Sequence, residues 1–274
     1  MTAARWTRGV TRHAERTALF AYMLVFFGFI LAPIAVAVIV SFDTKSFPGF
    51  PISGFTLRWY WRVWEYKPFI DSLVVSIELA LGSAALACLI AMPGALALAR
   101  SRSWSSDVIS TFLLAPLSMP MIVLGLAFLY YLAALGFGIS FLSLLISHTV
   151  ISIPYIARTV AGVYRGLGPD YEEAASILGA DRLRTFWYVT LPLVRPGIFA
   201  GSMFATLISF DNLPLSYFFG SATTNTLPVV MLSYLEYQFD PSVAAVSTIQ
   251  MLLALLALLV VDRVYGLRHM SAPT

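Results

Sequence analysis

Residues 108–157 read VISTFLLAPLSMPMIVLGLAFLYYLAALGFGISFLSLLISHTVISIPYIA, without a single Asp, Glu, Lys or Arg. An α-helix needs about 20 apolar residues to cross the hydrocarbon core of a membrane, so this stretch is long enough for two crossings. Gly136 and Gly138 supply a turn near its middle. The stretch therefore predicts two successive membrane-spanning helices, at 108–133 and 140–162.

Apolar runs on either side predict four more spans, at residues 19–41, 69–99, 196–220 and 241–262. Of the 274 residues, 59% are hydrophobic and only 11% are charged. A soluble domain has about 25% charged residues, so the composition favours a membrane protein. We expect an all-α fold with six transmembrane helices within residues 19–265, an N-terminal segment 1–18 and a C-terminal tail 266–274.

The distribution of basic residues predicts the orientation of these spans. Four basic residues lie in the segment between the first two spans, namely Lys45, Arg58, Arg62 and Lys67. The other thirteen of the 17 Lys and Arg residues then lie on the opposite side. Because basic residues accumulate on the cytoplasmic side, we expect both termini in the cytoplasm. The chain is then a multi-pass protein of the inner (plasma) membrane of a bacterial cell. The first apolar run is too long for a cleaved signal peptide, so we expect it to remain as a helix.

The external segment 43–68 contains the sequence TLRWYWRVWE at residues 56–65. Trp61 and Trp64 are three residues apart, which suits a short helix that lies at the membrane interface with its indole rings at headgroup level. The helix is either an aromatic anchor or a docking surface for an external partner.

The segment between the fourth and fifth spans, residues 165–192, is the most charged stretch on the cytoplasmic side. Pro169 and Asp170 predict the start of a helix, because proline and acidic residues suit the first helical turn. Gly179 predicts its end. Asp181 predicts the cap of a second short helix.

This second helix is predicted to cover residues 182–189 and to break at Leu191-Pro192. In the first helix, Ala174 and Ala175 expose little bulk. Two short helices joined at a glycine form a compact projection that fits the groove of a partner protein.

Within this segment, Glu173-Ala174-Ala175, Gly179 and Val189-Thr190-Leu191-Pro192 resemble the EAA signature of the permease subunits of bacterial ABC importers. That family usually has Ile where this chain has Val189. Six spans with such a segment between the fourth and fifth match the family's plan over nearly the whole chain. The resemblance implies the type I importer permease fold, in which this segment docks on a cytoplasmic ATPase. We therefore call residues 165–192 the coupling loop.

The resemblance also implies the residues and partners involved. The residues expected to couple the chain to the ATPase are Asp170, Glu172, Glu173, Ala174, Ala175, Gly179, Ala180, Leu191 and Pro192. The expected partners are an ATPase dimer, a second permease that is homologous but different, an external or periplasmic solute-binding protein and membrane lipid. No nucleic acid is expected, because the basic residues lie at the ends of apolar runs. The chain itself is expected to bind no cofactor, with ATP and magnesium held by the partner ATPase.

Three shorter stretches resemble the permeases of spermidine/putrescine-type systems. They are Leu57-Arg58-Trp59-Tyr60, Ser209-Phe210-Asp211-Asn212, and Thr226-Leu227-Pro228-Val229 with the later Asp240-Pro241. Many relatives have two acids where this chain has Asp211-Asn212. The resemblance implies that the cargo is a polyamine or a related amine or amino-acid-like compound.

Four polar residues within the spans are candidates for the substrate pathway, namely His148, Asp211, Asn212 and Tyr217. Asp211 lies about 15 Å from the outer end of the fifth span, where a carboxylate faces a cavity, a partner or an ion. It either contacts a cationic cargo or forms a hydrogen bond to the companion permease. Asn212 and Pro214 predict a local break in the helix. His148 forms either a helix-packing hydrogen bond or a gate, and it has no second metal ligand at a suitable spacing.

Several signatures are absent from the sequence. There is no G-x-x-x-x-G-K-[ST] phosphate-binding loop, and the only two lysines, Lys45 and Lys67, are expected outside the cell. Cys88 is the single cysteine. We therefore do not expect an enzyme. The alternative function is a stand-alone secondary transporter that uses Asp211 and His148 for ion coupling, but the small size and the lack of repeated halves argue against it.

Overall fold

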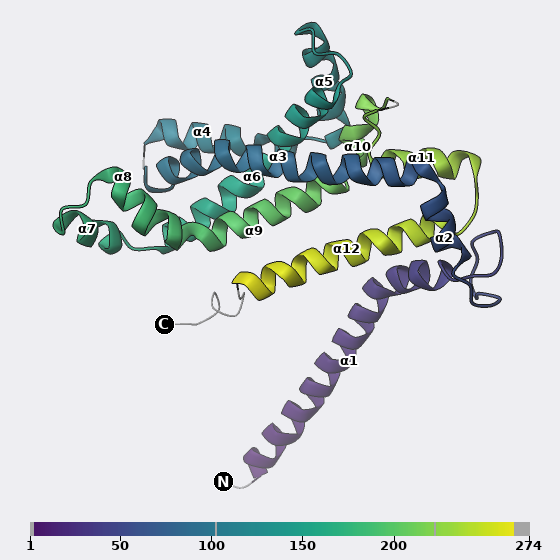
Figure 1. The fold of residues 1–274 in the computed structure, drawn as a ribbon. Coiled ribbons are helices and arrows are strands. Elements are labelled where there is room, and N and C mark those ends of the chain that lie inside the picture. Colours follow the sequence, from purple (N-terminus) through teal and green to yellow (C-terminus); the bar gives the residue numbers. More distant parts are fainter. Residues whose placement is uncertain (1–2, 102, 222, 266–274) are drawn as a thin grey trace. The chain divides into compact units, whose positions relative to one another are not determined.

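The computed structural model describes residues 3–101, 103–221 and 223–265, and the predicted tail 266–274 lies outside them. In chain order, the helices are α1 (Ala3–Val40), α2 (Arg58–Glu65), α3 (Lys67–Arg100), α4 (Trp104–Leu114), η1 (Ala115–Ser118), α5 (Met121–Ala134), α6 (Phe141–Gly166), α7 (Asp170–Ile177), α8 (Arg182–Thr185), η2 (Phe186–Thr190), α9 (Leu191–Phe210), α10 (Leu213–Ser216), η3 (Tyr217–Phe219), α11 (Leu227–Tyr237) and α12 (Ser242–Tyr265) (Figure 1). No strand occurs among these residues apart from one isolated bridge between Asp43 and Phe55. The prediction of an all-α fold is confirmed.

Within the described part of the chain, five helical stretches are long and apolar enough to cross a membrane. They are Glu15–Val40, Lys67–Arg100, Phe141–Gly166, Arg182–Phe210 and Ser242–Val260. A sixth crossing results if the pair Trp104–Ser118 and Met121–Ala134 counts as one broken span. The positive φ angles of Gly136 (+86°) and Gly138 (+58°) place the predicted turn between α5 and α6.

The third predicted span, 108–133, is not one straight helix. Its two halves are bent by 107° at the break between Ser118 and Met121. Pro116 lies in the short η1 turn, and Pro120 adopts an extended ψ of 125° just before α5. Proline cannot donate a backbone hydrogen bond, so the α-helical ladder is interrupted at this point. The third predicted span therefore consists of two helices that meet at a sharp bend.

The fifth predicted span, 196–220, also has different bounds. The helix begins earlier, because η2 and α9 form one run, and α9 ends at Phe210. The short helix α10 then begins after Asn212. The expected break at Asp211-Asn212 is confirmed, so this polar pair lies at a helix end rather than inside a span.

By its internal contacts, the chain divides into two units. One unit comprises Met1–Glu65 and Tyr237–Leu252, and the other comprises Tyr66–Glu236 and Leu253–Thr274. In the first unit, the indole N–H of Trp59 donates to the Asp43 carbonyl oxygen at 2.7 Å. The predicted helix at 56–65 forms as α2 and exposes Trp61 and Trp64, as an aromatic anchor at an interface requires.

In the second unit, α3, α6 and α9 lie side by side (Figure 1). Their shared core consists mainly of small residues, namely Ala84, Ala87, Ala91, Ala95, Ile156, Ala157, Val160 and Ala205. Gly197 and Gly201 bring α9 onto the backbone of α6, since a Cβ added at Gly201 would lie 2.8 Å from the Ile156 Cα. Small residues spaced four apart allow helix backbones to approach closely within a membrane.

Within the same unit, the coupling loop and the α10–α11 segment lie at opposite ends of this three-helix core (Figure 1). Both segments contain polar residues that the sequence analysis selected. The core therefore separates two groups of candidate functional residues.

Candidate functional site

The coupling loop begins with α7, whose bounds match the prediction. Pro169 precedes the helix, and Asp170, Glu172 and Glu173 all lie in its first turn, where negative charge is favoured. The helix ends where Gly179 adopts a φ of +83°, a left-handed conformation that glycine adopts at no steric cost. The amide of the next residue, Ala180, donates to the Ala175 carbonyl at 3.0 Å and closes the helix end.

The second half of the loop differs from the prediction. Asp181 caps α8 as expected, because its Oδ1 accepts a hydrogen bond from the Arg184 amide at 2.8 Å. However, Leu191-Pro192 does not break the chain direction, since α8 continues through the π-helical turn η2 into α9. The Leu191 amide donates to the Phe186 carbonyl, five residues back. This wider turn precedes Pro192, which lies in the first turn of α9, where a missing amide donor is tolerated.

The Glu172 carboxylate is the centre of a polar cluster that fixes α7 to the helix core. The Thr190 hydroxyl donates to Glu172 Oε1 at 2.6 Å, and the Tyr164 hydroxyl donates to the same oxygen at 2.9 Å. Arg100 forms an ion pair with Glu172 Oε2. Its guanidinium also stacks over the Tyr164 ring, 4.3 Å from the centroid. One carboxylate thus joins the ends of α3 and α6 to α7 and η2.

These contacts set the ionisation of Glu172. Partial burial alone would raise the pKa of the carboxyl group. The hydrogen bonds from Thr190 and Tyr164 and the positive charge of Arg100 outweigh it, so the net effect is a lowered pKa. Glu172 is therefore ionised at neutral pH and accepts all three contacts.

Glu173 has a different environment from its neighbour. Its side chain is exposed and forms no hydrogen bond or ion pair with any residue that the structure describes. The loop also exposes large apolar side chains. Ile177 and Leu178 are 86% and 87% exposed, and Leu183 and Tyr188 are exposed as well. The loop thus presents a free carboxylate and apolar side chains, while Glu172 holds it in place.

His148 lies in the opposite half of α6 and is fully buried. Its Nδ1 is 2.8 Å from the Ser209 hydroxyl, and its Nε2 is 3.1 Å from the Ser216 hydroxyl. Ser83 donates to Ser209 at 3.0 Å and extends the network to α3. The ring therefore joins α6 to α9 and α10, in agreement with the packing interpretation of His148.

The other three candidates lie close together in the chain but have different environments. Asn212 is buried and caps α10, because its Oδ1 accepts a hydrogen bond from the Leu215 amide at 3.0 Å. Asp211 is exposed and forms no side-chain hydrogen bond or ion pair with the described residues. Tyr217 is 55% exposed. Asp211 and Tyr217 are thus accessible, whereas Asn212 has a structural role.

Comparison with known proteins identifies the kind of protein. Residues 89–267 match the family described as binding-protein-dependent transport system inner membrane component. The chain belongs to this family. It is a multi-pass membrane protein and the permease component of an ABC importer, and it is not an enzyme.

Two relatives illustrate the range of the family. The permease is 29% identical to the spermidine/putrescine transport system permease protein PotC of Haemophilus influenzae over 235 residues, which are 86% of this chain and 91% of PotC. It is 33% identical to the molybdenum transport system permease protein ModB of Mycobacterium bovis over 234 residues, 78% of this chain and 87% of ModB. The predicted likeness to polyamine permeases is confirmed.

Solved structures confirm the fold. The permease resembles a chain of a bacterial ABC transporter involved in the import of the acidic polysaccharide alginate, with a TM-score of 0.68 and 16% identity over 97% of this chain and 99% of that chain. It also resembles a chain of the MetNI methionine ABC transporter, with a TM-score of 0.60 and 18% identity over 72% and 94% of the two chains. The predicted type I importer permease fold is therefore correct.

The sequence analysis did not select three residues of the permease that hold Glu172 and thereby α7 in place, namely Arg100, Tyr164 and Thr190. Arg100 and Tyr164 lie at the ends of predicted spans, where aromatic and basic residues are common. Thr190 lies inside the EAA-like stretch but was considered only as part of the signature. The available signal for this cluster was a polar residue at the end of each of three neighbouring spans. Which of these residues would contact Glu172 depends on the tertiary fold.

Proposed function

We propose that this permease forms half of the translocation path of an ATP-driven importer and receives the motion of a cytoplasmic ATPase dimer through its coupling loop. The observation that supports this proposal is the contrast between two adjacent carboxylates. Glu172 is held by Arg100, Tyr164 and Thr190, whereas Glu173 is free. A rigid projection with a free acid and exposed apolar side chains suits a protein partner.

In this proposal, Glu173 pairs with a basic group or a backbone donor of the ATPase, and Ile177, Leu178 and Leu183 enter an apolar groove. ATP and magnesium belong to that partner. Displacement of α7 would pull on α3 and α6 together, because Glu172 bridges Arg100 and Tyr164. Closure of the ATPase dimer would thereby reach the helix core.

The proposed orientation puts the coupling loop and both termini in the cytoplasm. It follows from the positions of the 17 basic residues, of which only Lys45, Arg58, Arg62 and Lys67 lie between the first two spans. A second, homologous permease would complete the path. One solved complex of the alginate transporter includes a periplasmic protein loaded with an alginate pentasaccharide, and we propose an external binding protein here as well.

We propose a polyamine or related amine as the cargo. The names of PotC and of the putrescine permease PotI of Escherichia coli support this class, whereas that of ModB points to a different one. The exposed carboxylate of Asp211 suits a cationic cargo. A thermal-shift screen of the binding protein encoded alongside the permease, with spermidine, putrescine and molybdate, should show stabilisation by an amine. Stabilisation by molybdate alone would contradict the proposed cargo.

The experiment that tests the coupling role uses the reconstituted importer. We expect Glu173→Ala to lower co-purification of the ATPase and to abolish the ATP hydrolysis that the loaded binding protein stimulates. The matched control is Glu15→Ala, which removes an exposed carboxylate from α1. If Glu173→Ala retains full stimulated hydrolysis and uptake, the coupling role of this carboxylate is wrong.

A further inference from the structure

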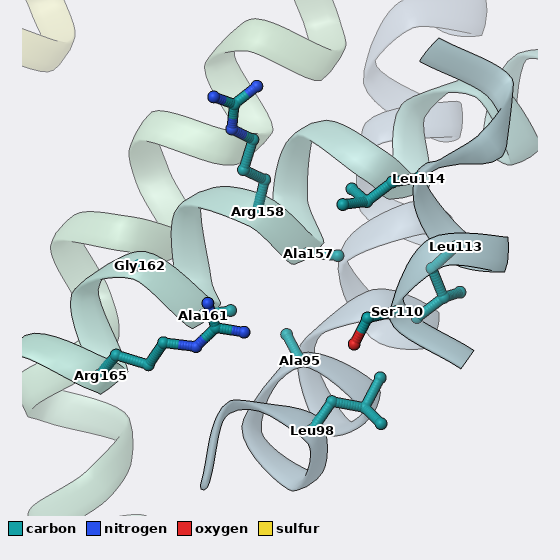
Figure 2. A pocket seen from close by; sticks show the side chains of 10 residues that line it. All are labelled: Ala95, Leu98, Ser110, Leu113, Leu114, Ala157, Arg158, Ala161, Gly162 and Arg165. Carbon is teal, nitrogen blue, oxygen red and sulfur yellow. The ribbon is translucent and has the colours of Figure 1, made fainter. Parts of the chain in front are cut away.

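A hollow of about 300 Å³ lies between α3, α4 and α6, next to the coupling loop (Figure 2). Its walls are mainly apolar and include Leu98 from α3 and Leu113 and Leu114 from α4. The α6 wall contains Ala161, whose short side chain leaves the space open. Neither the Glu172 cluster nor the His148 network uses this hollow.

Two polar groups face the apolar walls. Figure 2 shows the Arg165 side chain stretched toward Ala161 and the middle of the hollow, and the Ser110 hydroxyl pointing inward from α4. The Arg165 side chain is exposed and forms no hydrogen bond or ion pair with any residue that the structure describes. The guanidinium of Arg158, which also lines the hollow, points away from it (Figure 2). The hollow thus combines one available positive charge with a hydrocarbon-like interior.

The position of Arg165 indicates the origin of the ligand. It is the second-to-last residue of α6, a helix that is long and apolar enough to cross a membrane. The end of such a helix lies at headgroup level, where arginine side chains pair with anionic groups of the surface. Leu113 and Leu114 lie at the end of α4 that is farther from residues 101–103 and would be level with acyl chains.

We propose that this hollow binds one anionic phospholipid from the leaflet at the coupling-loop end of the permease. Arg165 and Ser110 contact the phosphate, and an acyl chain lies along Leu98, Leu113 and Leu114. A free inorganic anion would satisfy Arg165 but would leave the apolar walls uncovered. A zwitterionic lipid would fill the walls, but its ammonium group would offset the attraction of its phosphate for Arg165. The bound lipid fills the space between α4 and the α3–α6 pair.

The test uses the complete importer, purified in neutral detergent and stripped of lipid. Native mass spectrometry would count the retained phosphatidylglycerol and phosphatidylcholine after titration with each. We expect Arg165→Gln to weaken phosphatidylglycerol binding roughly fivefold, the effect of one basic residue at an anionic surface. Ala161→Leu should displace the lipid without a change in charge, whereas Arg165→Lys should largely retain it.

The control variant is Arg195→Gln, which removes an exposed arginine from α9 that does not line the hollow. It should retain lipid as the wild type does. Thermal stability is also measured with inorganic phosphate instead of lipid, to separate a free phosphate ion from a lipid headgroup. We expect the free ion not to raise the thermal midpoint. Equal phosphatidylglycerol retention by wild type, Arg165→Gln and Ala161→Leu would overturn the proposal. Equal protection by inorganic phosphate or equal binding of phosphatidylcholine would overturn it as well.

Discussion

At the scale of single residues, Glu172 and Glu173 differ only in the direction in which α7 presents them. The sequence places both acids in the first turn of a helix, where either could serve a partner or the core. The partners of Glu172 come from α3, α6 and η2. No local pattern joins residues so far apart in the chain, so the choice between the two acids could not be predicted.

We predict that Glu172→Gln destabilises the permease, because the amide keeps the shape of the side chain but removes the charge that Arg100 pairs with. The expected loss is on the order of 1 kcal/mol, since Glu172 is partly solvent-exposed and the ion pair is screened. The measurement is the thermal midpoint of the purified complex. Glu173→Gln is the control and should leave the midpoint unchanged.

The effect of Glu172→Gln should depend on pH. The folded-state pKa of Glu172 is lowered, so its stabilisation is present above the ordinary value of 4.5 and is lost as the pH falls through the folded-state pKa. The difference in midpoint between wild type and Glu172→Gln should therefore be largest near neutral pH and disappear in acid. A difference that stays constant into acid would exclude ionised Glu172 as its cause.

At the scale of helices and turns, the prediction was most accurate where the local chemistry decides the structure. Pro169, Gly179 and Asp181 act on their own neighbours, and each takes the place predicted for it. The bend between α4 and α5 was missed because the apolar composition continues through it. Pro116 and Pro120 were the available signal, but length and hydropathy alone do not distinguish a straight span from a broken one.

We predict that Gly179→Val uncouples the importer, whereas Gly179→Asn is tolerated better. The φ of +83° strains any residue with a Cβ by roughly 1–2 kcal/mol, branching increases the strain, and asparagine adopts this conformation more readily. No atom lies within 4 Å of an added Cβ, so the effect comes from the backbone. Stimulated ATP hydrolysis and uptake would be measured on assembled complexes. Equal activity of both variants would show that the left-handed turn is not required.

The contact between α6 and α9 was not predicted, although Gly197 and Gly201 form a G-x-x-x-G pattern. We expect Gly201→Ala to destabilise the permease by roughly 1–3 kcal/mol, because the new Cβ would lie 2.8 Å from the Ile156 Cα. The same substitution at Gly94 in α3 meets no atom within 4 Å and is the matched control. Thermal midpoints of the two variants should differ, and similar values would show that α9 can move away from α6 without cost.

At the scale of the whole molecule, the sequence predicted the class of elements because lipid imposes simple requirements on composition and length. It could not predict which polar side chains meet, because those contacts depend on how the helices pack. α1 exposes apolar side chains along most of its length, including Phe29 at 81%. Such a surface has to face lipid or the companion permease. The surroundings of α1 are therefore decided only in the assembled importer.

The proposed orientation can be tested on the intact chain. Cys88 is the single cysteine, so a Cys88→Ser background allows one reactive position at a time. We predict that cysteines at Thr7 and Ser271 resist an impermeant thiol reagent in intact cells and react after the membrane is opened. A cysteine at Ser46, an exposed position between the first two spans, should react in intact cells. Basic residues resist translocation, so thirteen of 17 on one side favour this arrangement strongly. Labelling at both Thr7 and Ser271 in intact cells, with Ser46 protected, would show that the chain has the opposite orientation. The coupling loop would then lie outside the cell, where no ATPase could reach it.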